Sequence, residues 1–271
     1  MMILRVAVYL VAVLLVNLPV IVTLVTSFKS AAEIARNPGL WIEAPTLANY
    51  ARVFADAGRV DMTGYLLNSL AASLTGTVLA ILLAFPAAYG IARSGLGRRW
   101  LMPLVVNLRA MPLVIFAIPI YMMFQWAGLL DTRLGLGLVL AVVNLPLTLV
   151  LLLNGVEEVP FEIEEAAVMD GAGRLSRMLR VVAPLCRPAF VTAFVFGFIT
   201  AWNEFLFGLI LTTRDAVPVT VGASFFFASG GGGVQWGVAS AVMVLAALPP
   251  VILGSVLYRY LAGSLAGAVK G

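Results

Sequence analysis

Long uncharged runs, separated by short polar segments, dominate the chain. A charge at the centre of a lipid-facing helix is costly, so uncharged runs of about 20 residues or more mark candidate membrane-spanning helices. Four of the six candidate runs carry no charge, and the third and fifth carry one each, Arg109 and Glu204 respectively. Together the runs predict an all-α membrane protein with six transmembrane helices, at residues 6–28, 64–92, 100–130, 134–156, 188–213 and from near Gln235 to 258.

Glycine and proline separate the last two runs. Residues 216–258 are uncharged but too long for one helix, and Pro218 and the four glycines at 230–233 interrupt them. At the other end, residues 6–28 follow a basic Arg5 as the core of a signal peptide does. Their apolar run exceeds the roughly 7–15 residues of such a peptide, and no small-residue cleavage site follows it. We therefore expect a retained first helix.

Basic residues between the runs predict the orientation. Six helices place both termini on one side of the membrane. With the N-terminus inside, ten lysines and arginines lie on the inner side and six on the outer side, which favours cytoplasmic termini. Residues 29–63 then form an external cap. Residues 157–187 form the one long cytoplasmic segment, which holds 10 of the 30 charged residues.

Composition removes several classes of chemistry. Of 271 residues, 62% are hydrophobic and 11% are charged, with a mean hydropathy of +1.05, and these values exclude an ordinary soluble domain. The chain has no histidine and one cysteine, Cys186, so a disulfide within the chain is excluded and metal-dependent or triad chemistry is not expected. A formal net charge of +4 is small for this length and does not indicate nucleic acid.

The cytoplasmic segment has the pattern helix, glycine corner, helix. Its first half is predicted to be a helix that begins at Pro160, since proline is common at helix starts and the acidic residues that follow stabilise a helix N-terminus. Gly171 and Gly173 interrupt this helix. Its second half carries one apolar stripe at helical spacing, made of Leu175, Met178, Leu179 and Val182. One interpretation is an amphipathic elbow lying on lipid headgroups. The anionic inner leaflet repels acidic residues, so a protein partner is the favoured interpretation.

The same segment contains a motif of fixed spacing. Glu165-Ala166-Ala167 is followed after three residues by Gly171, and after nine more by Val181-Val182-Ala183-Pro184. This pattern resembles the EAA signature of ABC importer permeases, with Val181 and Ala183 as apolar departures from its Ile-x-Leu-Pro end. Nearly the whole chain resembles the carbohydrate branch of that family, the maltose-type second permease. The other segments that carry the resemblance are Ser27-Phe28-Lys29, Asn49-Tyr50, Asn68-Ser69-Leu70, 87–93, Met111-Pro112, 118–121, 202–205 and 267–271.

The resemblance implies a type I ABC importer permease fold in the plasma (inner) membrane of a bacterium or archaeon. Besides membrane lipid, the implied partners are a second permease, a cytoplasmic ATPase dimer and an extracytoplasmic solute-binding protein. The implied solute is a sugar or polyol. The chain has no Gly-x-x-x-x-Gly-Lys-Ser/Thr loop, so we expect neither enzymatic activity nor a cofactor in it, with ATP and Mg bound by the ATPase. The alternatives are a permease for another solute, such as glycerol phosphate or an oligosaccharide, and a stand-alone channel or secondary carrier.

This interpretation divides the chain into three parts. Residues 1–63 hold the first helix and external loop, residues 64–260 the core of five helices, and residues 261–271 a cytoplasmic tail. The coupling helix lies within residues 160–184. The residues that the resemblance assigns to contact with the ATPase are Glu164, Glu165, Ala166, Ala167, Asp170, Gly171, Arg174 and Pro184.

Four residues inside the predicted helices are candidates for the translocation path. A charged side chain that faces lipid costs free energy, so Arg109 and Glu204 are expected to face the interior of the bundle. Three alternatives are open: they pair with each other, they contact the partner permease, or they line the translocation path. Trp202 and Asn203 suit a sugar, because an indole face stacks on apolar sugar C–H groups and an amide bonds to hydroxyls. Anchoring of Trp202 at the membrane interface is the alternative.

Prolines inside two of the runs predict broken helices. Pro112 and Pro119 fall in the third run, and Pro249 and Pro250 fall in the sixth. Each removes a backbone hydrogen bond, and in transporters such breaks expose carbonyl groups to a cavity.

Overall fold

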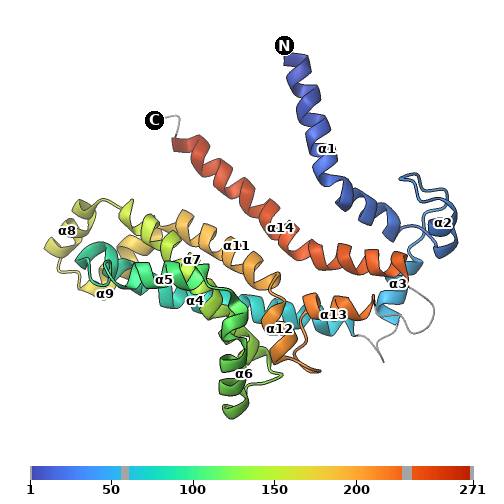
Figure 1. Ribbon diagram of the computed structural model, residues 1–271. Coiled ribbons are helices and arrows are strands. Elements are labelled where there is room, and N and C mark those ends of the chain that lie inside the picture. Colours follow the sequence, from blue (N-terminus) through green and yellow to red (C-terminus); the bar gives the residue numbers. More distant parts are fainter. Residues whose placement is uncertain (1, 56–60, 228–233, 269–271) are drawn as a thin grey trace. The chain divides into compact units, whose positions relative to one another are not determined.

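The computed structural model describes residues 2–55, 61–227 and 234–268 (Figure 1). These residues form helices and turns, and no strand occurs among them, which confirms the predicted all-α class. Four helices are long and apolar enough to cross a membrane: α1 (Met2–Ser27), α4 (Met62–Ser94), α7 (Arg133–Glu157) and α14 (Trp236–Ala268). The start of α14 agrees with the predicted start near Gln235.

Two bent pairs of helices are further candidates for membrane spans. The first joins α5 (Leu101–Ala110) to η1 (Leu113–Phe116) and α6 (Ala117–Trp126), with a bend of 101°. The second joins Arg174–Leu185 to α11 (Arg187–Trp202), with a bend of 78°. Counting each bent pair as one gives up to six spans, the predicted number, but the second pair covers Arg174–Trp202, where the sequence predicts a span at residues 188–213.

The prolines break one helix and leave two intact. The bend between α5 and η1 falls at Pro112, which has no N–H to continue the helix, so this predicted break is confirmed. Pro119 lies within α6, and Pro249 and Pro250 lie within α14, and both helices continue through them. The predicted breaks at these three prolines are therefore not seen. Pro119 is the third residue of α6, where a helix N–H has no intrahelical partner to lose.

The chain divides into two compact units, Met1–Leu66 with Val221–Pro249 and Leu67–Thr220 with Pro250–Gly271. The boundary at 66/67 lies close to the predicted division at 63/64. Residues 221–249, however, group with the N-terminal residues and not with the predicted core of 64–260.

In the first unit, hydrogen bonds tie the end of α1 to the loop that follows it, which holds α2 (Ala31–Arg36) and α3 (Ala48–Ala55). Asn49 Nδ2 donates to the carbonyl oxygens of Ser27 and Lys29, at 2.9 and 2.8 Å. The hydroxyls of Ser27 and Tyr50 lie 2.8 Å apart. Two short motifs that are separate in the sequence therefore lie together, and they stabilise a small polar cap.

In the second unit, α4, α7 and α11 share an apolar core. Its members include Phe85, Ala88, Leu152, Val156, Val182 and Ala193. Small residues bring α4 and α7 close together, as they do in other membrane bundles. A Cβ atom added at Gly76 would lie 2.7 Å from Leu140 Cβ, and one added at Gly137 would lie 2.8 Å from Thr75 Cβ.

A single carboxylate fixes the loop before α13 (Val219–Phe225) in the same unit. The side chain of Asp131 accepts hydrogen bonds of 3.0–3.1 Å from the backbone N–H groups of residues 213–216. Asp131 itself has a positive φ of 54°. Partial burial raises the pKa of Asp131, but the four N–H donors lower it further, so this pKa lies well below its ordinary value of 3.8. The ionised side chain therefore holds this loop at neutral pH.

Candidate functional site

The segment after α7 forms the predicted helix and corner. α8 (Phe161–Met169) begins directly after Pro160 and carries Glu162 and Glu164 in its first turn. The acids meet the positive end of the helix dipole, as their position in the sequence indicates. Gly171 follows with φ +81°, a left-handed conformation that glycine adopts without strain. The predicted glycine corner is therefore confirmed as a backbone feature.

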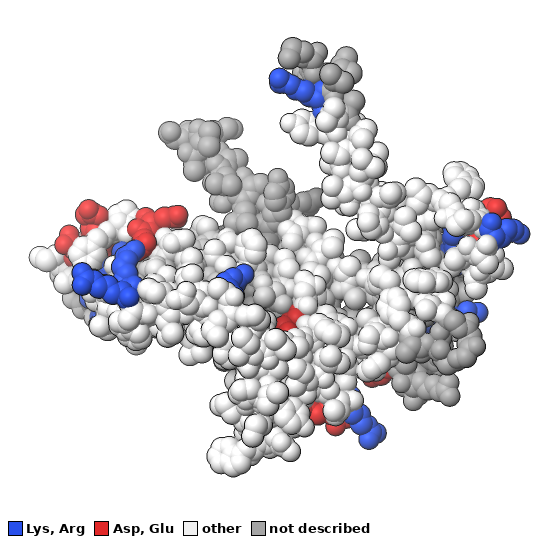
Figure 2. Space-filling model, in the orientation of Figure 1, with Lys and Arg blue, Asp and Glu red and all other residues white. Residues whose placement is uncertain are grey.

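α8 is an exposed helix with charge around it. Glu165, Ala166 and Asp170 are exposed, and Ala167 is half-buried. Acidic and basic side chains gather at the end of the unit where α8 and α9 (Arg174–Ser176) lie, next to a largely uncharged surface (Figure 2). This charged, exposed end of the unit is a candidate surface for binding another protein.

Glu164 differs from the other acids, because it points inward. Its side chain is fully buried, Tyr89 Oη donates to its carboxylate at 2.6 Å, and Arg93 Nε donates to it at 2.5 Å. Direct contact of Glu164 with an ATPase, as predicted, conflicts with this burial. Both residues that hold Glu164, Tyr89 and Arg93, lie in the segment 87–93 of α4, and no spacing in the sequence connects this segment with α8.

The second half of the segment departs from one regular helix. After α9, residues Arg177–Val182 form a π-helix (η2), which leads into α10 (Ala183–Leu185). Pro184, which has no N–H to donate to the carbonyl of Arg180, follows this π-helix, in which the N–H of Ala183 donates to the carbonyl of Met178.

The wider turn also redistributes the predicted apolar stripe. Val182 is buried and Met178 is half-buried, whereas Leu175 and Leu179 are 65% and 52% exposed. Arg174 and Pro184 are exposed as well. The stripe is therefore split between the core of the unit and an outer surface.

Glu204 lies in a break of the helix inside the fifth predicted run, and it caps the helix that follows. α11 ends at Trp202, and α12 (Leu206–Leu211) begins after three non-helical residues. The two oxygens of Glu204 accept the N–H groups of Leu206 and Phe207, both at 2.9 Å, and that of Gly208 at 3.4 Å. The carboxylate thus satisfies donors that the first turn of α12 leaves open.

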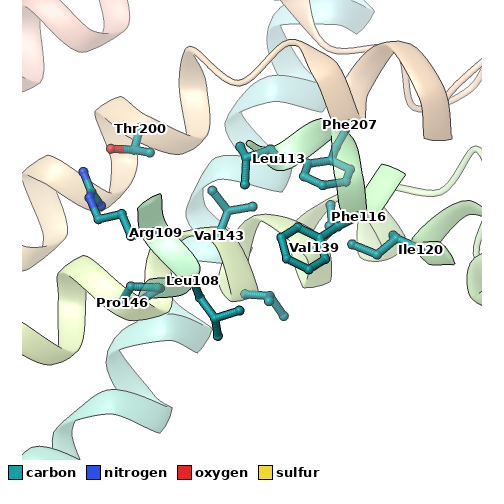
Figure 3. Close-up of a pocket in the computed structure, with 11 residues that line it drawn as sticks. Leu108, Arg109, Leu113, Phe116, Ile120, Val139, Val143, Pro146, Thr200 and Phe207 are labelled. Atoms are coloured by element: carbon teal, nitrogen blue, oxygen red, sulfur yellow. The ribbon is translucent and has the colours of Figure 1, made fainter. Parts of the chain in front are cut away.

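Arg109 has a different environment, and of the three roles open to Arg109 and Glu204 the structure does not show their pairing. Among the described residues no ion pair joins these two side chains, because the backbone of α12 occupies the Glu204 carboxylate. Arg109 instead lines a cavity of about 350 Å³. In Figure 3 Arg109 and Thr200 lie at one side of this cavity, and Phe116, Ile120 and Phe207 lie at the other.

The structure does not gather the four predicted path residues into one site. Trp202 is 3% exposed, and its ring stacks on Phe198 at a centroid distance of 5.6 Å, so its face is not open to a sugar. The predicted stacking by Trp202 therefore conflicts with its burial. Asn203 is exposed, and its amide donates to the carbonyl oxygen of Ile199 at 2.9 Å. Of the four, Arg109 alone is a lining residue of the cavity.

The described residues contain no cluster of three histidine, cysteine, aspartate or glutamate side chains that could hold a metal ion. What they contain is a bundle of apolar helices with breaks at Pro112 and at residues 203–205, and a charged, exposed segment between two spans. These features define a multi-pass membrane protein with a surface suited to a partner.

The chain belongs to the family of binding-protein-dependent transport system inner membrane components, whose model matches residues 66–267. It is 35% identical over 266 residues to the sulfoquinovosyl glycerol transport system permease protein SmoH of Agrobacterium fabrum, covering 96% of this chain and 92% of that one. It is 31% identical to the trehalose/maltose transport system permease protein MalG of Thermococcus litoralis, covering 93% and 91%. The resemblance to ABC importer permeases is thereby confirmed, and the chain is a transport permease.

A solved structure has the same fold. The crystal structure of a bacterial ABC transporter involved in the import of the acidic polysaccharide alginate contains a chain that matches with a TM-score of 0.80 and 22% sequence identity. The match covers 95% of each chain. The bent helices and the exposed segment after α7 therefore belong to a fold that ABC importers use.

Proposed function

We propose that this protein is the permease subunit of an ABC importer for a sugar or polyol, and that it forms the translocation path together with a second permease. The named relatives support this substrate class, since their names give sulfoquinovosyl glycerol and trehalose or maltose as transported solutes. A third relative, the diacetylchitobiose uptake permease NgcG of Streptomyces coelicolor, is 30% identical over 93% of this chain. These solutes share several hydroxyl groups on a sugar ring or a glycerol unit.

The exposed face of α8 is the observation that carries the proposal. Phe161, Ile163, Val168 and Met169 are 41–88% exposed on a helix that also presents exposed acids. An apolar patch rimmed by charge is typical of a protein interaction site. We assign this face to a cytoplasmic ATPase dimer that binds ATP and Mg, while this chain binds neither.

The same assignment gives the orientation in the membrane. If α8 meets the cytoplasmic ATPase, both chain termini lie in the cytoplasm, in agreement with the excess of arginine and lysine on that side. The cap formed by residues 29–55 then faces outward, toward a solute-binding protein. The membrane is the plasma (inner) membrane of a bacterium or archaeon.

Reconstitution tests the proposal. Tagged permease is co-expressed with the second permease and the ATPase, purified, and incorporated into liposomes with binding protein outside and ATP inside. Uptake is measured for a radiolabelled disaccharide, a polyol, a sulfonated sugar glycoside, glycerol phosphate and an amino acid. We expect ATP-dependent uptake of a hydroxylated solute and none by the permease alone. Transport by this chain alone without ATP would instead establish a channel or secondary carrier.

A further inference from the structure

The one buried side chain of α8 is charged. Of its nine residues Glu164 alone is buried, whereas its large apolar side chains are 41–88% exposed, and the Arg93 guanidinium lies 5.8 Å from the centre of the Phe161 ring. An amphipathic helix at the surface of a protein normally buries its apolar stripe against the core. The reversed arrangement leaves Glu164 as the one buried side chain through which α8 is held.

The contacts of Glu164 extend to two membrane-spanning helices. Arg93, near the end of α4, donates from Nε to Glu164 and from Nη2 to the carbonyl oxygens of Val156 and Val159, at 3.1 and 2.9 Å. Val156 lies in the last turn of α7, and Val159 lies in the turn that leads to α8. Tyr89, one turn earlier in α4, donates to the second carboxylate oxygen of Glu164. One guanidinium therefore connects α4, the end of α7 and α8.

We propose that Arg93, Glu164 and Tyr89 form the joint through which displacement of α8 reaches α4 and α7 during transport. The proposal rests on the proposed function, because it takes α8 as the helix that the ATPase moves. Charge-assisted hydrogen bonds fix distance and direction together, whereas an apolar contact allows helices to slide. Arg93 and Tyr89 are thus positioning residues that act on transport through Glu164.

A second ion pair at the same end of the unit provides a matched control. Arg98, in the turn after α4, lies 2.7 Å from Glu157 at the end of α7. The side chains of this pair are 55% and 35% exposed, compared with 14% and 0% for Arg93 and Glu164. A solvated pair of this kind contributes little and transmits little force, although it connects neighbouring segments.

The test uses the complete reconstituted complex with Glu164→Gln, Tyr89→Phe and the control Glu157→Gln. Three quantities are measured for each: ATPase co-purified per permease, ATP hydrolysed in the presence of loaded binding protein, and solute taken up. With Glu164→Gln we expect normal co-purification and an uptake per ATP that falls about tenfold, because the joint loses its charge while its shape remains. Tyr89→Phe removes one hydrogen bond and no charge, so its loss should be smaller. Glu157→Gln should match wild type.

Each other outcome overturns the proposal. Wild-type uptake per ATP with Glu164→Gln would show that the joint transmits nothing. A loss of co-purified ATPase in proportion to uptake would show a role in docking. Loss of both Glu164→Gln and Tyr89→Phe from the membrane fraction would show that the cluster merely holds the fold. A wild-type complex without ATP-driven uptake would contradict the proposed function, a failure that is visible before any variant is compared.

Discussion

Removing Glu204 and Arg109 singly and together provides a quantitative test of the break at the end of α11. Glu204→Gln replaces one acceptor oxygen by an NH2 group, so at least one of the two backbone N–H groups now bonded at 2.9 Å loses its partner. An unsatisfied buried donor costs about 1–3 kcal/mol. One of the two donors is the N–H of Phe207, a residue that is 1% exposed, so water does not easily replace the lost acceptor.

Arg109→Leu acts on a different environment. The Arg109 side chain lines the cavity and makes no ion pair with Glu204, so its removal leaves the cap of α12 intact. The two losses of stability should therefore add, with a coupling energy below about 0.5 kcal/mol. An ion pair between the two residues would give a double variant less damaged than the sum of the single variants.

The assay is thermal unfolding of the detergent-solubilised permease, followed by fluorescence and repeated on all four chains of the cycle. For domains of 150–250 residues a loss of 1 kcal/mol corresponds to about 2–4 °C, so Glu204→Gln should lower the midpoint by several degrees. Asn203→Ala, an exposed neighbour, is the control and should leave the midpoint nearly unchanged. A coupling energy above about 1 kcal/mol would refute the separate roles assigned to Glu204 and Arg109.

Three further predictions concern loops and the docking segment. Asp131→Asn should speed amide hydrogen exchange in the loop that Asp131 holds, and unchanged exchange in this variant would contradict the role of Asp131. In wild type the stability that Asp131 contributes is fully present above its ordinary pKa and is lost only as the pH falls through the lowered pKa. Gly171→Val should weaken ATPase binding, because a left-handed backbone costs about 1–2 kcal/mol for an L-residue, while Gly173→Val, at φ −67°, should be tolerated; equal effects in a pull-down would exclude the corner as the cause. Glu165→Lys should reduce the ATPase pulled down, high salt should weaken the native complex, and Arg52→Glu serves as the charge control; full retention with Glu165→Lys at low and high salt would leave this acid without an electrostatic role.

The charge-free runs predict the long helices closely because one physical effect dominates them. Residues 64–92 and 134–156 were expected as spans, and α4 and α7 extend two residues or fewer beyond them at each end. A charge cannot lie against lipid without a large cost, so charges delimit such helices. The break at Pro112 is equally predictable, because any proline lacks the backbone N–H that continues a helix.

The candidate site was harder to predict, because it depends on contacts between distant residues. Glu164 and Glu165 are identical neighbours in a short helix, and which one turns inward is decided by Arg93, 71 residues from Glu164 in the chain. The break after Trp202 contains neither glycine nor proline. From the sequence, Glu204 is therefore a candidate partner for Arg109. In the structure Glu204 instead accepts the backbone N–H groups that the break leaves without a helical partner.

Disulfide cross-linking from the tip of α8 tests the central claim most directly. The native Cys186 is 2% exposed, so Met169→Cys, at a position 88% exposed, adds an accessible thiol to the chain. Trp126→Cys, at the end of α6 and 92% exposed, is the control on the side predicted to be external. In membranes that contain the co-expressed ATPase with a cysteine in its permease-facing cleft, we expect an oxidant to form a permease–ATPase adduct with Met169→Cys and none with Trp126→Cys. No adduct from Met169→Cys, or equal adducts from both positions, would contradict a permease that is coupled to its ATPase through α8.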